Sequence, residues 1–182
     1  MTLAPDVDPA LGRCVEATRA LFGAAACSIA LVDEDGGTLE FVASDGVGSQ
    51  EIVGVTIPVS RGIAGWAAMS GQPIAVRDVQ SDARFARDVA ESTHYVPDAI
   101  YAAPMLDAQG EVLGVASVLD PTVDETSDWT LHVLGTIAGL MALVTTATAT
   151  PSGPAAQPLA GLGGDILRLV ESWRAEQSGG SE

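Results

Sequence analysis

Apolar residues recur at helical spacing near the start of the chain. Asp8 and Pro9 suit the N-cap and the first position of a helix, and Gly23 suits its end. The residues that share one face of this helix are Leu11, Cys14, Val15, Thr18 and Phe22. The pattern therefore predicts a helix that begins at Pro9 and ends before Gly23.

Two pairs of apolar runs, each pair separated by a short polar turn, predict two β-hairpins. The turn at 33–37 contains paired glycines that tolerate positive φ, and the second turn lies at 107–110. The four strands predicted on either side of these turns are 26–32, 38–44, 99–106 and 111–119.

The centre of the chain is less regular than its ends. The segment 45–54 is polar and contains glycine, so we expect a loop. Short strands are expected at 55–59 and 73–76, and helical segments at 63–69 and 83–92. The last predicted element of this part is a long apolar helix over 127–146 with acidic residues at its positive end.

The order of these elements predicts the fold class. Helix, two strands, an irregular centre, two strands and a helix are typical of an α+β fold. We expect an antiparallel sheet of five or six strands, with the N- and C-terminal helices packed on one side. This domain is predicted over 8–148.

The tail has a different composition. Residues 149–164 are rich in Pro, Gly and Ala and are predicted to form a linker. Residues 165–177 are predicted to form an amphipathic helix, which is too short to be stable alone and must dock on something. Its apolar stripe consists of Ile166, Leu169, Val170 and Trp173.

The composition limits the partners of the chain. It has 182 residues, 47% of them hydrophobic, and 24 acids against 8 bases, a net charge of −16; all eight bases are arginine. Such a surface offers little counter-charge for a phosphate backbone or an anionic lipid surface, so we expect neither nucleic acid nor membrane as a partner. The apolar stretch 131–150 is long enough for a membrane span, but threonines and His132 dilute it, so a buried helix is the preferred interpretation. The N-terminus has no signal-peptide pattern, and we expect a cytoplasmic protein.

The central sequence resembles the GAF domain family. The matching segments, in order, are Gly62–Ala68, Ser70–Ile74, Asp78–Val79, Asp82, Arg84–Phe85, Tyr101–Met105 and Gly110–Val115. The resemblance covers nearly all of the predicted domain and leaves only the tail unexplained. It implies a regulatory fold that senses a small molecule or dimerises, with a pocket between the sheet and the central helices. Because no output domain fits after Thr148, the expectation is a stand-alone bacterial GAF-domain protein that signals through a partner, or a fragment of a longer sensor.

Several residues are candidates for lining that pocket. Aromatic rings with a few polar groups suit a small ligand, although the same rings also suit plain packing. Gly62 and Gly65 permit either a tight chain reversal or an anion cradle at a helix start. The candidate ligand-binding residues are Trp66, Arg77, Phe85, His94, Tyr95, Tyr101 and Ser117. Four arginines in 27 residues mark the pocket mouth as a place where an anion could bind: Arg61, Arg77, Arg84 and Arg87.

No catalytic constellation stands out in the sequence. No serine has a histidine at a motif spacing, so the first choice is a non-catalytic sensor or regulatory module that binds a small molecule or a protein partner. The resembled family includes a free methionine sulfoxide reductase that uses pocket cysteines. Cys14 and Cys27 lie on the predicted first helix and first strand, so this enzymatic alternative is less favoured, and we expect no metal site.

His94 supports another alternative, a haem-based gas or redox sensor. It lies ten residues before Pro104, and the haem-binding GAF domains of bacterial oxygen sensors have their axial histidine at a similar distance from the strand proline. A neutral imidazole that faces an apolar pocket is a competent axial ligand. The competing interpretation is a surface or loop histidine with local hydrogen bonds, and no other cofactor is required by the sequence.

The predicted long helix has apolar residues around most of its circumference. One sheet cannot bury all of them, so a second partner surface is implied. We expect a homodimer through the first and the long helices, as the family resemblance also implies. The tail stripe around Trp173 is an alternative cover for the same surface.

Overall fold

The computed structural model of the chain describes residues 2–3, 9–123 and 128–149. The chain divides into two units, Met1–Thr148 and Ala149–Glu182. The predicted tail helix (165–177) and the predicted linker (149–164) beyond its first residue lie outside the described residues. The sheet and the helices that pack on it belong to the first unit.

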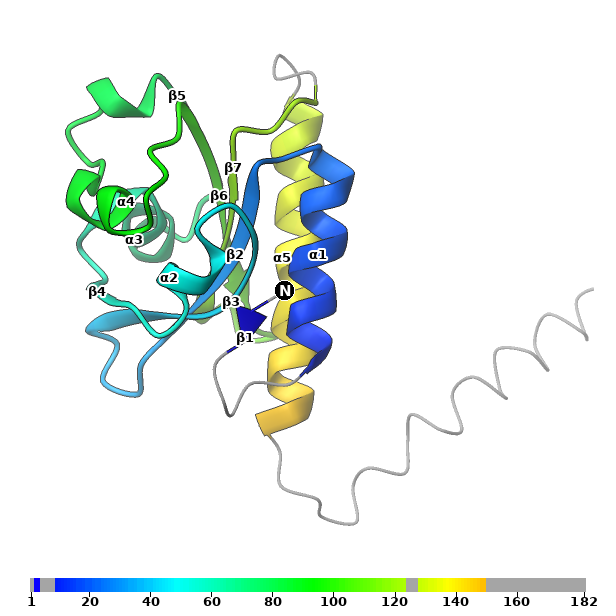
Figure 1. The fold of residues 1–182 in the computed structure, drawn as a ribbon. Helices are drawn as coiled ribbons and strands as arrows, with labels where there is room; N and C mark the ends of the chain where they lie inside the picture. Colours follow the sequence, from blue (N-terminus) through cyan, green and yellow to red (C-terminus); the bar gives the residue numbers. More distant parts are fainter. Residues whose placement is uncertain (1, 4–8, 124–127, 150–182) are drawn as a thin grey trace, which may run out of the picture. The chain divides into compact units, whose positions relative to one another are not determined.

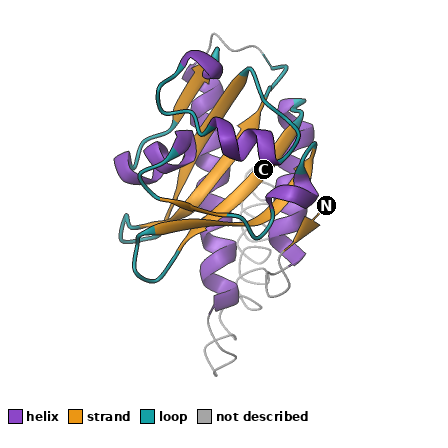
Figure 2. Ribbon diagram, turned by 60° about the vertical axis from the view of Figure 1, so that its left-hand side comes forward, coloured by secondary structure: helices purple, strands orange, loops and turns teal. Residues whose placement is uncertain are grey.

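The described chain forms one antiparallel sheet with helices on both faces (Figures 1 and 2). The strand order is β1-β3-β2-β7-β6-β5, and β4 pairs with β3 beside this path. In chain order the elements are β1 (Thr2–Leu3), α1 (Pro9–Phe22), β2 (Ala26–Val32), β3 (Thr38–Gly46), α2 (Ser49–Ile52), β4 (Thr56–Pro58), α3 (Gly62–Ser70), β5 (Ile74–Arg77), a 3-10 turn (Val79–Ser81), α4 (Arg87–Ser92), β6 (Ala99–Leu106), β7 (Val112–Leu119) and α5 (Asp128–Ala149).

The α+β fold predicted from the sequence is confirmed, and so are its two hairpins. Strands β2 and β6 have the predicted bounds, because both are apolar runs bounded by polar or turn residues. Two short elements were not predicted. Strand β1 forms only by pairing with Ser44 and Ala43 of β3, and α2 lies within the segment expected to be a loop.

The N- and C-terminal helices pack on one face of the sheet, as predicted. Leu11 and Val15 of α1 and Leu134 and Met141 of α5 are almost completely buried there, against the strands. Residues of β2, β6 and β7 that point to this face complete the cluster, which we call the helix-side core: Cys27, Ile29, Tyr101, Ala103, Met105, Ala116 and Val118. Burial of this apolar surface is the main force that holds α1 and α5 on the sheet.

The three shorter helices, α2, α3 and α4, cover the other face (Figure 1). They pack on strand residues that alternate with those of the helix-side core, as expected for a pleated strand. The second apolar cluster, which we call the pocket-side core, consists of Ala30, Leu39, Phe41, Ile57, Ile63, Ala67, Ala68, Val76, Val79, Ala102 and Val115.

A β-bulge in β3 changes which side chains reach each face. Ile29 of β2 pairs with Ala43, whereas the next residue, Ala30, pairs with Phe41, so Val42 is the additional residue in β3. The alternation shifts by one position there. Phe41 and Ser44 consequently both face the pocket side, although they are three residues apart.

The start of α3 depends on two glycines. Gly62 has a φ of +75°, and a Cβ on Gly65 would lie 2.4 Å from the carbonyl oxygen of Val59. The chain reversal and close approach expected of such glycines are therefore both present. This geometry seats the first turn of α3 against the strand residues that precede it.

Helix α5 is unusually apolar. Its segment Trp129–Ala147 is long and apolar enough to cross a membrane, by length and composition alone, and 28% of its most apolar part is buried. The same helix supplies Leu134, Ala138 and Met141 to the helix-side core. The core helix of a soluble protein can be equally long and apolar, so the segment is weak evidence for a membrane span.

Candidate functional site

A pocket of about 110 Å³ lies between the pocket face of the sheet and helices α2, α3 and α4. Its lining is mostly apolar. The residues around it are Ala26, Ser28, Phe41, Ser44, Val47, Gly48, Ile52, Ile57, Gly62, Ile63, Ala64, Phe85, Ala86, Val89, Ala90, Thr93, Tyr95, Pro97, Ile100, Ser117 and Leu119. The position agrees with the pocket that the sequence resemblance implies.

Three serines from three neighbouring strands form a row on the floor of the pocket. Ser28 of β2 is paired directly with Ser44 of β3 on one side and with Ser117 of β7 on the other. Directly opposed residues have Cβ atoms about 4.5–5.5 Å apart, so the row crosses the central strands in steps of that size. All three serines are buried, with exposed fractions of 6%, 2% and 5%. We call this set the serine row.

The three hydroxyls of the serine row differ in their hydrogen bonds. Ser44 donates to the carbonyl oxygen of Cys27 at 3.2 Å. Within the described part of the chain, the hydroxyls of Ser28 and Ser117 have no hydrogen-bond partner in the protein. Both residues line the pocket, so their hydroxyls can bind a group that enters it.

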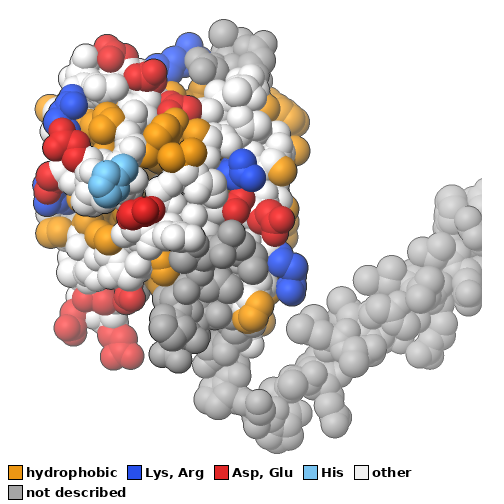
Figure 3. Space-filling view, in the orientation of Figure 1, with side chains coloured by type: hydrophobic (Ala, Val, Ile, Leu, Met, Phe, Trp, Pro, Cys, Tyr) orange, Lys and Arg blue, Asp and Glu red, His pale blue; other side chains and the backbone are white. Residues whose placement is uncertain are grey.

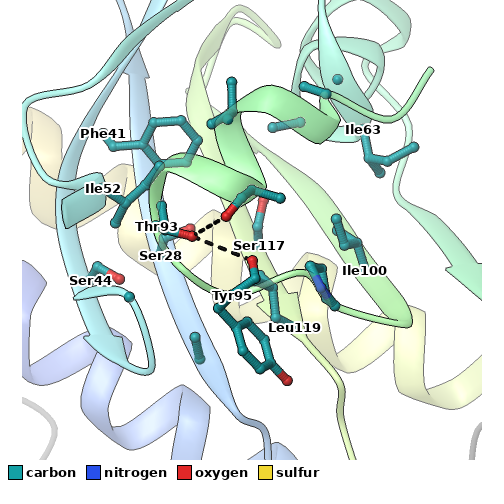
Figure 4. A pocket seen from close by; sticks show the side chains of 18 of the residues that line it. Ser28, Phe41, Ser44, Ile52, Ile63, Thr93, Tyr95, Ile100, Ser117 and Leu119 are labelled. Carbon is teal, nitrogen blue, oxygen red and sulfur yellow. Dashed lines mark hydrogen bonds between the residues drawn. The ribbon is translucent and has the colours of Figure 1, made fainter. Parts of the chain in front are cut away.

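The pocket walls are apolar side chains from several elements. Figure 4 shows Phe41 and Ile52 on one side of the pocket and Ile63 and Ile100 on the other. The hydroxyl of Thr93, also on the lining, is engaged locally with the carbonyl oxygens of Ala90 at 2.8 Å and Tyr95 at 3.4 Å. The walls therefore add little hydrogen-bonding capacity of their own.

Tyr95 contributes its ring to the pocket and its hydroxyl to a contact outside it. The hydroxyl donates to the carboxylate of Asp120, whose other oxygen accepts the backbone N–H groups of Asp98 (2.9 Å) and Ala99 (2.7 Å). Burial and the hydrogen bond to Asp120 raise the pKa of Tyr95 to about 12. Asp120 thus fixes the segment that carries Tyr95 to the start of β6.

Among the described residues that line the pocket, none carries a charged side chain. The arginines expected at its mouth do not line it; Arg61 and Arg84 line an outer groove that shares Gly62 and Phe85 with the pocket. Each has a partner close by. Arg61 pairs with Asp88, and Arg84 holds Asp82 through two hydrogen bonds of 2.9 and 2.6 Å. Arg87 donates to the carbonyl oxygen of Gln80 at 3.3 Å. Figure 3 likewise shows acidic side chains in separate groups, with arginines beside some of them.

The structure brings three of the predicted site residues to the pocket, namely Phe85, Tyr95 and Ser117. Trp66 lies in an outer groove on α3, with the guanidinium carbon of Arg84 5.3 Å from the centroid of its ring. The other three predicted residues line neither of these sites.

Arg77 is exposed at the end of edge strand β5. Tyr101 lies in the helix-side core, on the opposite face of the sheet from the pocket, and is 1% exposed. Placing it in the pocket was wrong, because residues on both faces of β6 are apolar, so the sequence pattern does not indicate which face Tyr101 occupies.

His94 does not fit the haem hypothesis. It is exposed, has a φ of 57° after the end of α4, and does not line the pocket. A haem is far larger than a cavity of about 110 Å³. The interpretation of His94 as a loop residue agrees with this geometry.

The two cysteines lie away from the pocket. Cys27 belongs to the helix-side core, and Cys14 of α1 packs against the same cluster. Burial raises the pKa of Cys27 to about 12, so its thiol stays protonated and is a poor nucleophile. The arrangement does not support the reductase alternative, which needs thiols in the pocket.

Most of the pocket floor was missed from the sequence. Ser28 and Ser44 were not proposed, although a lone serine inside an apolar strand is a signal that something polar faces it. Their alignment with Ser117 depends on the register of three strands and on the bulge at Val42. That register is a long-range property and is not visible in any one segment.

A family-wide sequence model of the GAF domain matches residues 6–144. The chain therefore belongs to the GAF domain family, a family of regulatory and sensor modules that are generally non-catalytic.

The chain is 34% identical over 68 residues to the cGMP-specific 3',5'-cyclic phosphodiesterase of Drosophila mojavensis. This match covers 37% of the chain and 6% of that protein, so the chain spans a small fraction of such curated relatives. Two solved structures show the same fold. The GAF domain of A. aeolicus nlh2 in an inactive state has a TM-score of 0.61 at 22% identity, over 72% of this chain and 80% of that one. The free methionine-R-sulfoxide reductase of Neisseria meningitidis in complex with its substrate has a TM-score of 0.62 at 20% identity, over 76% and 77%.

Proposed function

We propose that this chain is a non-catalytic sensor module that binds a small molecule in the pocket above the serine row. The observation that carries the proposal is an apolar pocket lined by two buried serines, Ser28 and Ser117, whose hydroxyls have no hydrogen-bond partner among the described residues. A ligand would satisfy these groups and fill the cavity at once. Membership of a family of sensor modules supports the same conclusion.

The sheet provides a route from the pocket to the terminal helices. Ser28 lies between Cys27 and Ile29 in β2, and Ser117 lies between Ala116 and Val118 in β7. These four flanking residues belong to the helix-side core that holds α1 and α5. A ligand that shifts the central strands therefore changes the packing of α1 and α5, and we expect altered amide hydrogen exchange in both helices on binding.

The outward face of α5 supports a second part of the proposal, a homodimer. Trp129, Leu140 and Leu143 are 65%, 58% and 60% exposed on one face of this helix, where exposed His132 and Thr136 lie between Trp129 and Leu140. Three large exposed apolar side chains on one face favour an interaction surface. The proposal places α5 in a protein interface rather than in a membrane, with the chain in the cytoplasm and a signalling partner as its output.

Native mass spectrometry of the freshly purified full chain tests ligand binding and subunit number together. We expect a dimer and a small additional mass that is lost on mild activation. Ala90→Phe, which fills the pocket from α4, should abolish the additional mass, whereas Ala108→Phe in an exposed turn should retain it. If the protein carries no additional mass and a metabolite library does not raise its Tm relative to Ala90→Phe, the ligand-sensor proposal is wrong.

The dimer is tested separately by light scattering on the full chain. We expect Leu140→Glu combined with Leu143→Glu to give a monomer, because two buried charges would disrupt an apolar interface. Met69→Glu is the matched control, since Met69 is 66% exposed on α3 at the other face of the sheet. A wild-type chain that is monomeric at all concentrations contradicts the dimer.

Cyclic GMP, named in the description of the phosphodiesterase relatives, is one probe to include. Its cyclic phosphate is an anion, and the described lining of the pocket has no charged side chain to balance it. We expect no binding of cGMP to this chain. Tight binding of cGMP would support the sensor but identify an anionic class of ligand.

A further inference from the structure

The pocket has hydrogen-bonding groups at two separate places. The first is the serine row, where Ser44 already donates to a carbonyl oxygen and Ser28 and Ser117 have no partner in the described part of the protein. Both of these hydroxyls belong to residues that are more than nine-tenths buried and line the cavity. Each hydroxyl can donate one hydrogen bond and accept others.

The second place is the start of α3. Gly62, Ile63 and Ala64, the first three residues of this nine-residue helix, line the same pocket. The N-cap residue, Arg61, provides no side-chain hydrogen bond to the first turn. The first N–H groups of a helix have no intrahelical acceptor, so this end of the pocket favours an oxygen that accepts hydrogen bonds.

The charge balance decides which kind of oxygen fits. A helix N-terminus carries the equivalent of about half an elementary charge, which does not balance a full buried negative charge. Arg61 and Arg84 are paired with Asp88 and Asp82 outside the pocket. Arg87 lies over the ring of Phe85, but it is exposed and does not line the pocket. A buried ion without a partner is strongly disfavoured, whereas a carbonyl oxygen satisfies the same donors at no such cost.

We propose that the ligand is a compact, uncharged and mainly apolar molecule. A carbonyl or amide oxygen faces the start of α3, and a second hydrogen-bonding group reaches Ser28 and Ser117. Its apolar body contacts Phe41 and Ile63. This inference rests on the proposed function, because it specifies the ligand class of the same pocket. It excludes carboxylates and phosphates as ligands.

Matched pairs of small probes test the ligand class with the full chain. Each pair has nearly the same shape and differs in charge: isobutyramide against isobutyrate, and benzamide against benzoate. Binding is followed by NMR shifts of the methyl groups of Ile63, Ile100 and Leu119, which line the pocket. We expect each amide to bind at least tenfold more tightly than its carboxylate.

The serine variants test the floor contact. Ser117→Ala and Ser28→Ala should each weaken amide binding by about three- to tenfold, the loss expected for one hydrogen bond. Binding of toluene, which has no polar group, should stay unchanged in the same variants. Ser81→Ala, in an exposed turn, is the control and should change neither. The comparison of amide and carboxylate affinities uses only the wild-type chain. It therefore tests whether the ligand is uncharged even if one serine variant fails to fold.

The outcomes separate the two proposals. Carboxylates that bind at these methyl groups as tightly as the amides overturn the uncharged ligand and leave the sensor proposal standing. Equal amide binding by wild type and both serine variants overturns the role of the serine row. If no probe, toluene included, shifts the pocket methyl groups, both the ligand class and the proposed function fail.

Discussion

The two faces of the sheet are built from the same strands but are packed to different degrees. On one face, α1 and α5, of 14 and 22 residues, cover the strands, and Leu134, Ala138 and Met141 are at most 1% exposed. On the other face, helices of four, nine and six residues leave a cavity of about 110 Å³. Long helices close a face, whereas short helices joined by turns leave space that a ligand can occupy.

The largest expected change in the free energy of unfolding comes from shortening a side chain on the more tightly packed face. Leu134→Ala should lower the free energy of unfolding by about 3 kcal/mol, because it opens a cavity where the helix-side core is closed. Ile100→Ala removes atoms that already border the pocket, so we expect a smaller loss of about 1–2 kcal/mol. Urea unfolding measures both values. Equal losses would contradict the difference in packing.

The second prediction concerns close backbone approach on the pocket side. Gly65→Ala should destabilise the chain by about 1–3 kcal/mol, because the new Cβ would lie 2.4 Å from the carbonyl oxygen of Val59. Gly135→Ala is the matched control in α5, where a Cβ meets nothing within 4 Å. There we expect a gain of about 0.5–1 kcal/mol from helix propensity. Thermal unfolding of the two variants should therefore move in opposite directions.

The third prediction compares members of the serine row in the ligand-free protein. Ser44→Ala should cost about 1 kcal/mol, because it removes the hydrogen bond to the carbonyl oxygen of Cys27. Ser28→Ala and Ser117→Ala should change the free energy of unfolding by no more than about 0.5 kcal/mol, since each removes a hydroxyl that lines the pocket and has no partner in the described part of the protein. A larger loss of stability in these two variants, measured by urea unfolding, would indicate a structural role instead.

The smallest expected effect is on the pH dependence of stability and comes from the ion pair of Asp82 and Arg84 at the rim of the pocket side. The hydrogen bonds from Arg84 lower the pKa of Asp82 from 3.8 to about 2. The folded chain favours the ionised form of Asp82. The stabilisation that Asp82 gives the folded state is therefore present above pH 3.8 and is lost as the pH falls through about 2. Asp82→Asn should flatten the pH dependence of stability in that range. Because the Arg84 side chain is 37% exposed, added salt should reduce the effect, and acid titrations at two salt concentrations measure it.

The sequence predicts the elements of this fold better than it predicts the site. Apolar runs with turn residues at their ends place β2 and β6 at their observed bounds, because both signals are local. The short helix α2 and the two-residue β1 were missed, since four and two residues are too few to show a period. The helix-side and pocket-side positions of β6 are equally apolar, so Tyr101 could not be placed from its own strand.

The residues of the pocket were harder to predict from the sequence than the helices and strands. Phe85, Tyr95 and Ser117 were predicted as site residues, and all three line the pocket. Ser28 and Ser44 were not, because they become neighbours of Ser117 only when β2 pairs with β3 and β7. A single segment carries no information about which residues oppose it across a sheet.

The bulge at Val42 implies a particular way for such a pocket to diversify. Side chains before and after this residue follow opposite phases of the strand, so removal of one residue would exchange Ser44 for its neighbour at the pocket face. A change of length by one residue would thus alter the side chains that line the pocket floor in a single event, while the order of the strands in the sheet stays the same. In an evolving lineage, a one-codon insertion or deletion at this point would alter ligand chemistry more abruptly than any substitution in the walls.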